Sequence, residues 1–190
     1  MIRKLCAAAL VALLPSSLPA VELGDDGLHI APWINETFRD LREDLEEATA
    51  NGQRFVVMIE QRGCIYCTQM HEEVYVIPEI EELLNEAFFV VRINMYGQTE
   101  VTDLDGETMS ESEIVRRWST MFTPTTFFLP EQVEEGLTVP QAAVAMVPGA
   151  FGRWTTFNML NWVLEEGYDS GEPFQAYHAR LLSDQISQGN

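Results

Sequence analysis

Residues 54–67 read RFVVMIEQRGCIYC, and this stretch decides the fold. Arg54 to Glu60 is a short run of apolar and β-branched residues, which predicts a buried strand. The residues that follow Cys64 suit a helix as far as about Tyr75. A turn of three residues therefore leads from the strand directly into a Cys-x-x-Cys pair at the start of the helix.

The position of this pair predicts its chemistry. At a helix N-terminus, free N–H groups and the helix dipole stabilise a thiolate. Cys64 is therefore the expected nucleophile, and Cys67, one turn later, is the expected resolving thiol of a redox-active disulfide. Gly63 leaves the approach to the Cys64 sulfur open, and the charge of Arg62 favours the thiolate.

The rest of the chain alternates between stretches with the spacing of a helix and short apolar runs typical of strands. Helices are expected at 35–50 (with Asn35 as N-cap), 64–75, 78–87, 110–118, 155–166 and 173–182. Strands are expected at 54–60, 88–95, 126–129 and 142–147, with a loop or small hairpin at 96–109. Ile65, Met70 and Val74 are the expected core contacts of the helix that carries the cysteines. This order predicts the α/β class, with a mixed central sheet and helices on both faces.

The first twenty residues have the layout of a secretory signal peptide. Arg3 and Lys4 precede a ten-residue apolar run that is too short to span a bilayer, and a cut is expected after Ala20. Residues 21–190 are then a single domain with its core at about 35–182. Removal of the signal changes the formal charge from −19 to −21, and leaves Cys64 and Cys67 as the only cysteines.

Composition excludes several classes of function. The chain has 190 residues, of which 46% are hydrophobic and 22% charged, the balance of a globular protein. Its formal charge of −19 argues against binding to nucleic acid, and also against an anionic membrane surface. We expect no stable membrane insertion after cleavage, and protein thiols and disulfides as partners.

Four stretches resemble the thioredoxin superfamily, and within it the SoxW-like periplasmic thioredoxins. They are residues 58–71, 88–95, 123–125 and 147–149. The resemblance implies a thioredoxin fold, a thiol–disulfide oxidoreductase and a periplasmic location. It also implies a cis Thr123–Pro124 bond facing the disulfide. The physics agrees, since the cis form costs little free energy only at an X–Pro bond. The implied substrate-binding residues are Thr123, Pro124, Ile65 and Tyr66.

The resemblance also implies a direction of electron flow. An oxidising periplasm keeps thiols oxidised, so a reductant there needs an electron supply. The implied source is a membrane donor of the DsbD or CcdA type, and the implied acceptor is a sulfur-oxidation carrier protein or an apocytochrome. No cofactor is implied. The sequence itself leaves the direction open.

The chain departs from cytosolic thioredoxin near the cysteines. Met58 stands where that family has a buried aspartate, which leaves the proton acceptor of the resolving thiol unassigned. Glu60 is the nearest acid in sequence, although a glutamate at a strand end is more often a solvated edge charge. Glu60, Arg62 and His71 are candidate modulators of the thiols.

Two other interpretations of the cysteine pair stay open. Cys64, Cys67 and His71 offer three zinc ligands, which would make the chain a metal-binding module. His29 and His178 are remote in sequence, so no fourth ligand is apparent. Alternatively the disulfide is a redox-inert staple, although a loop this short gives little entropic stabilisation.

Overall fold

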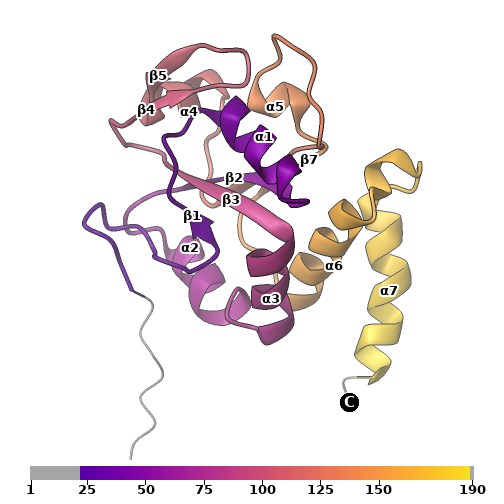
Figure 1. The fold of residues 1–190 in the computed structure, drawn as a ribbon. Helices are drawn as coiled ribbons and strands as arrows, with labels where there is room; N and C mark the ends of the chain where they lie inside the picture. Colours follow the sequence, from indigo (N-terminus) through magenta and orange to yellow (C-terminus); the bar gives the residue numbers. More distant parts are fainter. Residues whose placement is uncertain (1–21, 189–190) are drawn as a thin grey trace, which may run out of the picture.

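The structure is a computed structural model that describes residues 22–188, so the expected signal peptide lies outside the described residues. At its centre is a five-stranded sheet in the order β1-β3-β2-β6-β7 (Figure 1). β1, β3 and β2 are parallel, whereas β6 and β7 run antiparallel to their neighbours. The strands are β1 (Ile34–Asn35), β2 (Arg54–Glu60), β3 (Phe88–Asn94), β6 (Thr125–Phe128) and β7 (Ala145–Pro148).

Helices cover both faces of this sheet, which confirms the predicted architecture. One face carries α1 (Leu41–Ala50), α4 (Glu111–Arg117), α5 (Val139–Ala142) and the hairpin of β4 (Glu100–Thr102) and β5 (Thr108–Ser110) (Figure 1). The other carries α2 (Ile65–Gln69), the π-helical turn η1 (Met70–Val74), α3 (Pro78–Ala87) and α6 (Arg153–Leu164). The turn η2 (Gly167–Asp169) leads to α7 (Phe174–Gln188), which packs against α6. Among residues 22–188, no helix has the length and apolar character needed to cross a bilayer.

The central strand β2 explains why the core has two halves. All seven of its residues are buried, which is why residues 55–59 are continuously apolar instead of alternating with polar residues. Phe55, Val57 and Ile59 point toward the face of α1. Val56 and Met58 point toward the face of α2 and α6. Both halves of the core therefore hold β2 in place, and with it the turn that presents the cysteines.

The expected helix at residues 35–50 is wrong at its beginning. The helix starts at Leu41, because the carboxylate of Asp40 accepts hydrogen bonds from the backbone N–H groups of Arg42 and Glu43 and so caps it. Asn35 lies instead in β1, where it pairs with Val91 of β3. This fifth strand has only two residues and leaves no periodic signal in the sequence.

The expected strand at 142–147 is displaced toward the C-terminus. Thr138 and Gln141 form a capping box that begins the short helix α5, so strand β7 starts only at Ala145. Ile65 was expected in the core but is 73% exposed, whereas Met70 and Val74 are buried as expected. The cysteine-bearing helix therefore contacts the core through its second half.

Asp44 on α1 gives a prediction about stability. Its side chain is buried, and it accepts a hydrogen bond from Thr37 Oγ1 at 3.0 Å. Burial, helped by the neighbouring acids Asp40, Glu47 and Glu43, raises the pKa of Asp44 from 3.8 to about 6. A carboxyl whose pKa rises on folding contributes most stability below its unfolded pKa. That contribution is lost as the pH rises from about 4 to about 6.

We therefore expect Asp44→Asn to raise the free energy of unfolding at pH 7 by about 1–3 kcal/mol, and to have little effect near pH 4. Urea unfolding at both pH values measures this difference. Glu46→Gln, an exposed change on the same helix, is the matched control and should shift stability by less than about 0.5 kcal/mol. Equal stabilisation at both pH values would contradict the assignment to ionisation.

Candidate active site

A turn between β2 and α2 presents the cysteine pair. Gly63 has a φ of +70°, a left-handed conformation that side chains rarely adopt, and no atom lies within 4 Å of the place where a Cβ would stand. The next residue, Cys64, is the N-cap of α2 and has an extended backbone. The sequence therefore places the first cysteine at the positive end of the helix, with open space before it.

The two sulfur atoms have different surroundings. Cys64 and Cys67 form a disulfide with their Cα atoms 5.2 Å apart. Cys64 Sγ accepts hydrogen bonds from the backbone N–H of Cys67 at 3.0 Å and from Thr123 Oγ1 at 3.3 Å. Both residues are largely buried, Cys64 at 5% and Cys67 at 0% exposed. After reduction both donors would stabilise a thiolate on Cys64, so we expect Cys64 to be the nucleophile of the pair.

The loop before β6 faces the Cys64 sulfur. The Thr123–Pro124 bond is cis, and the Thr123 carbonyl oxygen lies 3.4 Å from Cys64 Sγ. The Pro124 carbonyl in turn accepts a hydrogen bond from the backbone N–H of Gly149 at 2.7 Å. Three separate loops, those of Cys64, Pro124 and Gly149, therefore meet at one place.

Exposed apolar side chains flank these loops. We call them the apolar rim: Ile65, Tyr66, Met121, Phe122 and Phe151, which are between 37% and 78% exposed. Exposed apolar side chains that gather around a site indicate a surface that contacts another protein. The sequence analysis identified Ile65 and Tyr66 but missed the other three, whose only signal was their nearness in sequence to Pro124 and Gly149.

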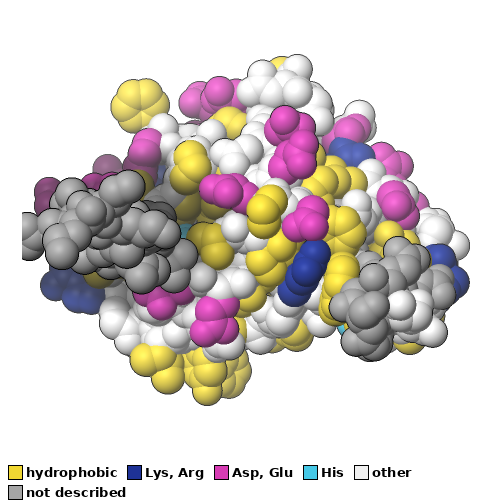
Figure 2. All heavy atoms as spheres, turned by 90° about the horizontal axis from the view of Figure 1, so that it is seen from below, with side chains coloured by type: hydrophobic (Ala, Val, Ile, Leu, Met, Phe, Trp, Pro, Cys, Tyr) yellow, Lys and Arg dark blue, Asp and Glu magenta, His cyan; other side chains and the backbone are white. Residues whose placement is uncertain are grey.

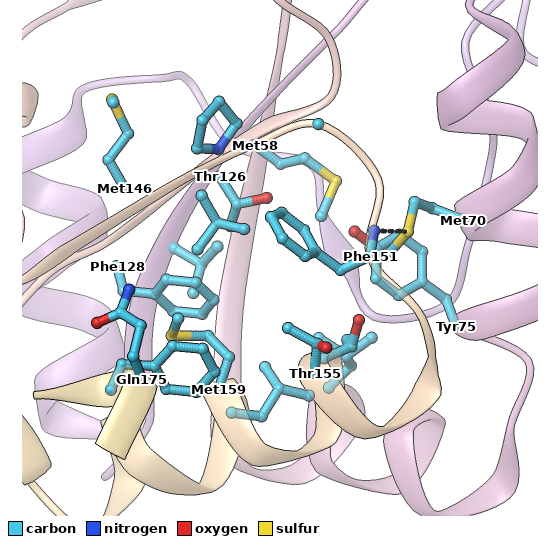
Figure 3. A pocket seen from close by; sticks show the side chains of 18 residues that line it. Met58, Met70, Tyr75, Thr126, Phe128, Met146, Phe151, Thr155, Met159 and Gln175 are labelled. Atoms are coloured by element: carbon cyan, nitrogen blue, oxygen red, sulfur yellow. Dashed lines mark hydrogen bonds between the residues drawn. The ribbon is translucent and has the colours of Figure 1, made fainter. Parts of the chain in front are cut away.

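A cavity of about 240 Å³ lies between the sheet and α6 (Figure 3). Four methionines line it, Met58, Met70, Met146 and Met159, together with Phe128, Phe151 and further aromatic and aliphatic side chains. The backbone N–H of Phe151 contacts Met70 Sδ at 3.3 Å, which links the Gly149 loop to the cysteine-bearing helix. Methionine is flexible and polarisable, so such a wall adapts to apolar groups of different shape.

Glu60 and His71, which flank the cysteine pair in sequence, belong to a buried polar cluster with the more distant His29. Glu60 at the end of β2 is 0% exposed, and its Oε1 lies 2.9 Å from His71 Nε2, so the interpretation of Glu60 as a solvated edge charge is wrong. The His71 ring stacks on that of His29, with centroids 4.4 Å apart. Burial, followed by the neighbouring His71, lowers the pKa of His29. The sequence analysis set His29 aside as remote, because nothing local in the sequence connects it to His71.

Arg62 points to a different part of the chain. Its guanidinium donates hydrogen bonds to the backbone carbonyls of Asp25 and Asp26. It thereby holds the N-terminal segment against the turn before Cys64. The described hydrogen bonds of Arg62 go to these two carbonyls. Those to Cys64 Sγ come instead from the backbone of Cys67 and the hydroxyl of Thr123.

The difference between the two sulfurs can be measured by alkylation. We expect iodoacetamide to label Cys64 in the reduced protein at pH 7 at least about tenfold faster than Cys67, because the thiolate is the reactive form. Mass spectrometry of timed samples gives both rates. Labelling in denaturant is the control and should equalise them. Equal rates in the folded protein would contradict the nucleophile assignment.

Comparison with known proteins supports this geometry. A family model described as "Thioredoxin-like domain" matches residues 41–145. Among curated proteins none matches. A solved thioredoxin-fold protein from Helicobacter pylori is 14% identical with a TM-score of 0.54, over 78% of this chain and 94% of that chain. A thioredoxin from Thermus thermophilus is 25% identical with a TM-score of 0.51, over 68% of this chain and 88% of that chain.

Proposed function

This chain belongs to the thioredoxin-like domain family and is a thiol–disulfide oxidoreductase with a thioredoxin fold, and from this premise we propose that it is a SoxW-like periplasmic reductant of partner proteins. The observation that carries the chemistry is the environment of Cys64 Sγ. This atom caps a helix, receives two hydrogen bonds and faces a cis-proline loop. These features suit a sulfur that alternates between thiolate and disulfide.

The exchange reaction proceeds in two steps. The Cys64 thiolate attacks one sulfur of a partner disulfide, so a mixed disulfide forms and the partner's other sulfur leaves as a thiolate. Cys67 then loses its proton and attacks Cys64 Sγ, which closes the Cys64–Cys67 disulfide and releases the partner's second sulfur. Two electrons pass from the dithiol to the partner, and its two thiolates take up the two protons that the cysteines gave up.

The surface around Cys64 supports binding of an extended partner segment. The backbone at Thr123 lies beside the Cys64 sulfur, where it can pair with such a segment. The apolar rim would contact the side chains on either side of the partner's cysteine. Acidic side chains are spread over the face seen in Figure 2, and the formal charge of −19 disfavours acidic partners at long range.

The location and the partners are proposed from the sequence. The layout of residues 1–20 supports export, and an exported reductant needs electrons from a membrane donor of the DsbD or CcdA type. A sulfur-oxidation carrier protein or an apocytochrome is the proposed acceptor. Cell fractionation followed by mass determination tests this part: we expect the protein in the periplasm without residues 1–20. Recovery of the full chain from the cytoplasm would overturn it.

The reduction potential tests the proposed direction. The protein is equilibrated in glutathione buffers, its free thiols are alkylated, and the mass gives the fraction reduced. A value below about −200 mV supports a reductant, whereas a value near −120 mV would indicate an oxidant of other thiols. A pair that does not titrate at all would overturn the exchange mechanism.

A further inference from the structure

Three separate segments of the fold bring together the side chains of His29, Glu60 and His71, and His29 is remote in sequence from the other two. His29 comes from the N-terminal segment, Glu60 from the end of β2, and His71 from the turn η1. One potential ligand atom of each lies within 4.8 Å of the other two. All three side chains are buried, at 6%, 0% and 3% exposed. Among residues 22–188, this is the one group of at least three histidine, cysteine or acidic side chains whose potential ligand atoms lie this close together.

The carboxylate of Glu60 is only half used. Its Oε1 lies against His71 Nε2, but Oε2 is buried and has no hydrogen-bond donor within the described chain. A buried carboxylate oxygen without a partner is costly, and such exceptions are rare in folded proteins. Glu60 Oε2 therefore lacks the partner that a donor group or a bound cation would supply.

The backbone is irregular where it carries His71. The helix that begins after Cys64 changes to a π-helical turn at Met70–Val74, and turns of this kind occur frequently at functional sites. His71 Nε2 thereby reaches Glu60, while its ring stacks on His29. His29 Nε2 lies 3.2 Å from Thr68 Oγ1. The Thr68 hydroxyl is a weak partner for an imidazole nitrogen, and a metal ion would displace it.

We propose that His29, Glu60 and His71 bind one divalent transition-metal ion, with zinc as the best match and a water molecule in the fourth position. Two imidazoles and one carboxylate are a donor set that zinc accepts, with bonds of about 2.0–2.2 Å. Ligand atoms of a tetrahedral site then stand about 3.3 Å apart. The two imidazole rings are stacked with 13° between their planes, and an imidazole binds a metal in its own ring plane, so the rings cannot share an ion in this arrangement. Binding therefore requires one ring to rotate out of the stack while the present spread of 4.8 Å closes to that distance.

The charges around the cluster fit a cation despite one arginine. Arg92 donates to the His29 carbonyl oxygen, but its guanidinium is also 3.7 Å from Asp26 and 4.0 Å from Glu36. Glu72 also acts on His29 through its charge. With Glu60 these acids outnumber the arginine. The ion would tie the N-terminal segment to β2 and to the cysteine-bearing helix.

The test uses the purified protein in its oxidised form, so that the cysteines cannot act as ligands. Titration calorimetry with zinc, together with metal analysis after dialysis, should give one ion per chain. At a hundredfold excess of zinc over the dissociation constant, the melting temperature should rise by about 5–10 °C. His29→Ala and Glu60→Gln should each weaken binding at least about hundredfold. Glu60→Gln keeps the volume and an oxygen that can face His71, so it should fold even if His29→Ala does not.

His178→Ala is the matched control, since this histidine contacts Thr155, Asn158 and Phe174, none of which belongs to the cluster. It should bind zinc as the wild type does. The double variant Cys64→Ser/Cys67→Ser should also keep the ion while losing disulfide exchange, which separates this proposal from the redox function. Absence of binding to the oxidised protein, or unchanged binding in Glu60→Gln, would overturn the proposal. Binding to the reduced form alone would instead indicate a thiolate site.

Discussion

Cys64→Ser is expected to lower the rate of disulfide exchange with a protein substrate by roughly three orders of magnitude or more, because the reaction loses its nucleophile. The hydrogen bonds from Cys67 N–H and Thr123 Oγ1 converge on this sulfur and on no other. Cys67 is 0% exposed against 5% for Cys64, and we expect that it does not replace Cys64 as the attacking group. Reduction of a protein disulfide, followed with dithiothreitol as the electron source, measures the rate.

Cys67→Ser is the matched variant, and it should lose exchange activity at a different step of the reaction. Turnover stops in both variants, but Cys67→Ser keeps the attacking thiolate and lacks the resolving thiol. It should therefore accumulate a mixed disulfide with the substrate, visible as a covalent adduct by mass. Both variants remove the same short disulfide loop, so this part of the stability change is common to them. Adducts on Cys64→Ser, or none on Cys67→Ser, would contradict the assigned roles.

Asp103→Ala is expected to lower the free energy of unfolding by about 3–5 kcal/mol. Asp103 is 0% exposed and holds together three elements. Its carboxylate accepts hydrogen bonds from Trp118 Nε1 at 2.7 Å, and from the backbone N–H groups of Leu104 at 2.8 Å and Val139 at 3.0 Å. It also pairs with Arg117 at 3.2 Å. Alanine would leave the Trp118 indole N–H and the backbone N–H groups of Leu104 and Val139 without their acceptor. Arg117 would keep its pair with Asp105.

Asp105→Ala is the control for this prediction. Asp105 pairs with the same Arg117, but it lies nearer to solvent, and surface ion pairs contribute about 1 kcal/mol or less. Urea unfolding of both variants gives the comparison. A loss of less than about 1 kcal/mol in Asp103→Ala would show that Asp103 is not the link between the hairpin, α4 and α5.

The elements of the fold that could be predicted are those with a local signal in the sequence. The run from Arg54 to Glu60 is the core strand β2, and Phe88–Asn94 is its parallel neighbour. The capping box at Ser110 begins α4 as expected, with Glu113 Oε2 accepting from both the backbone N–H and the hydroxyl of Ser110. Such signals act within a few residues, so the sequence carries them directly.

The errors lie where two segments compete or where an element is short. The residues after Asn35 have a helical spacing, but pairing of Asn35 with Val91 draws the segment into β1 and Asp40 begins the helix later. Strand β7 follows a four-residue helix that tertiary packing stabilises through the buried Val139. Elements this short depend on contacts with distant residues for their stability.

By itself the sequence determined the α/β class and the site of the thiol chemistry, because a cysteine pair after a buried strand is a local feature with a local physical reason. Only the tertiary structure decided that Glu60 is buried and that His29 stacks on His71, and it showed the cis Thr123–Pro124 loop beside the Cys64 sulfur that the resemblance had implied. These contacts join residues that are distant along the chain, and they exist only after the sheet has assembled. The metal site proposed above depends entirely on contacts of this second kind.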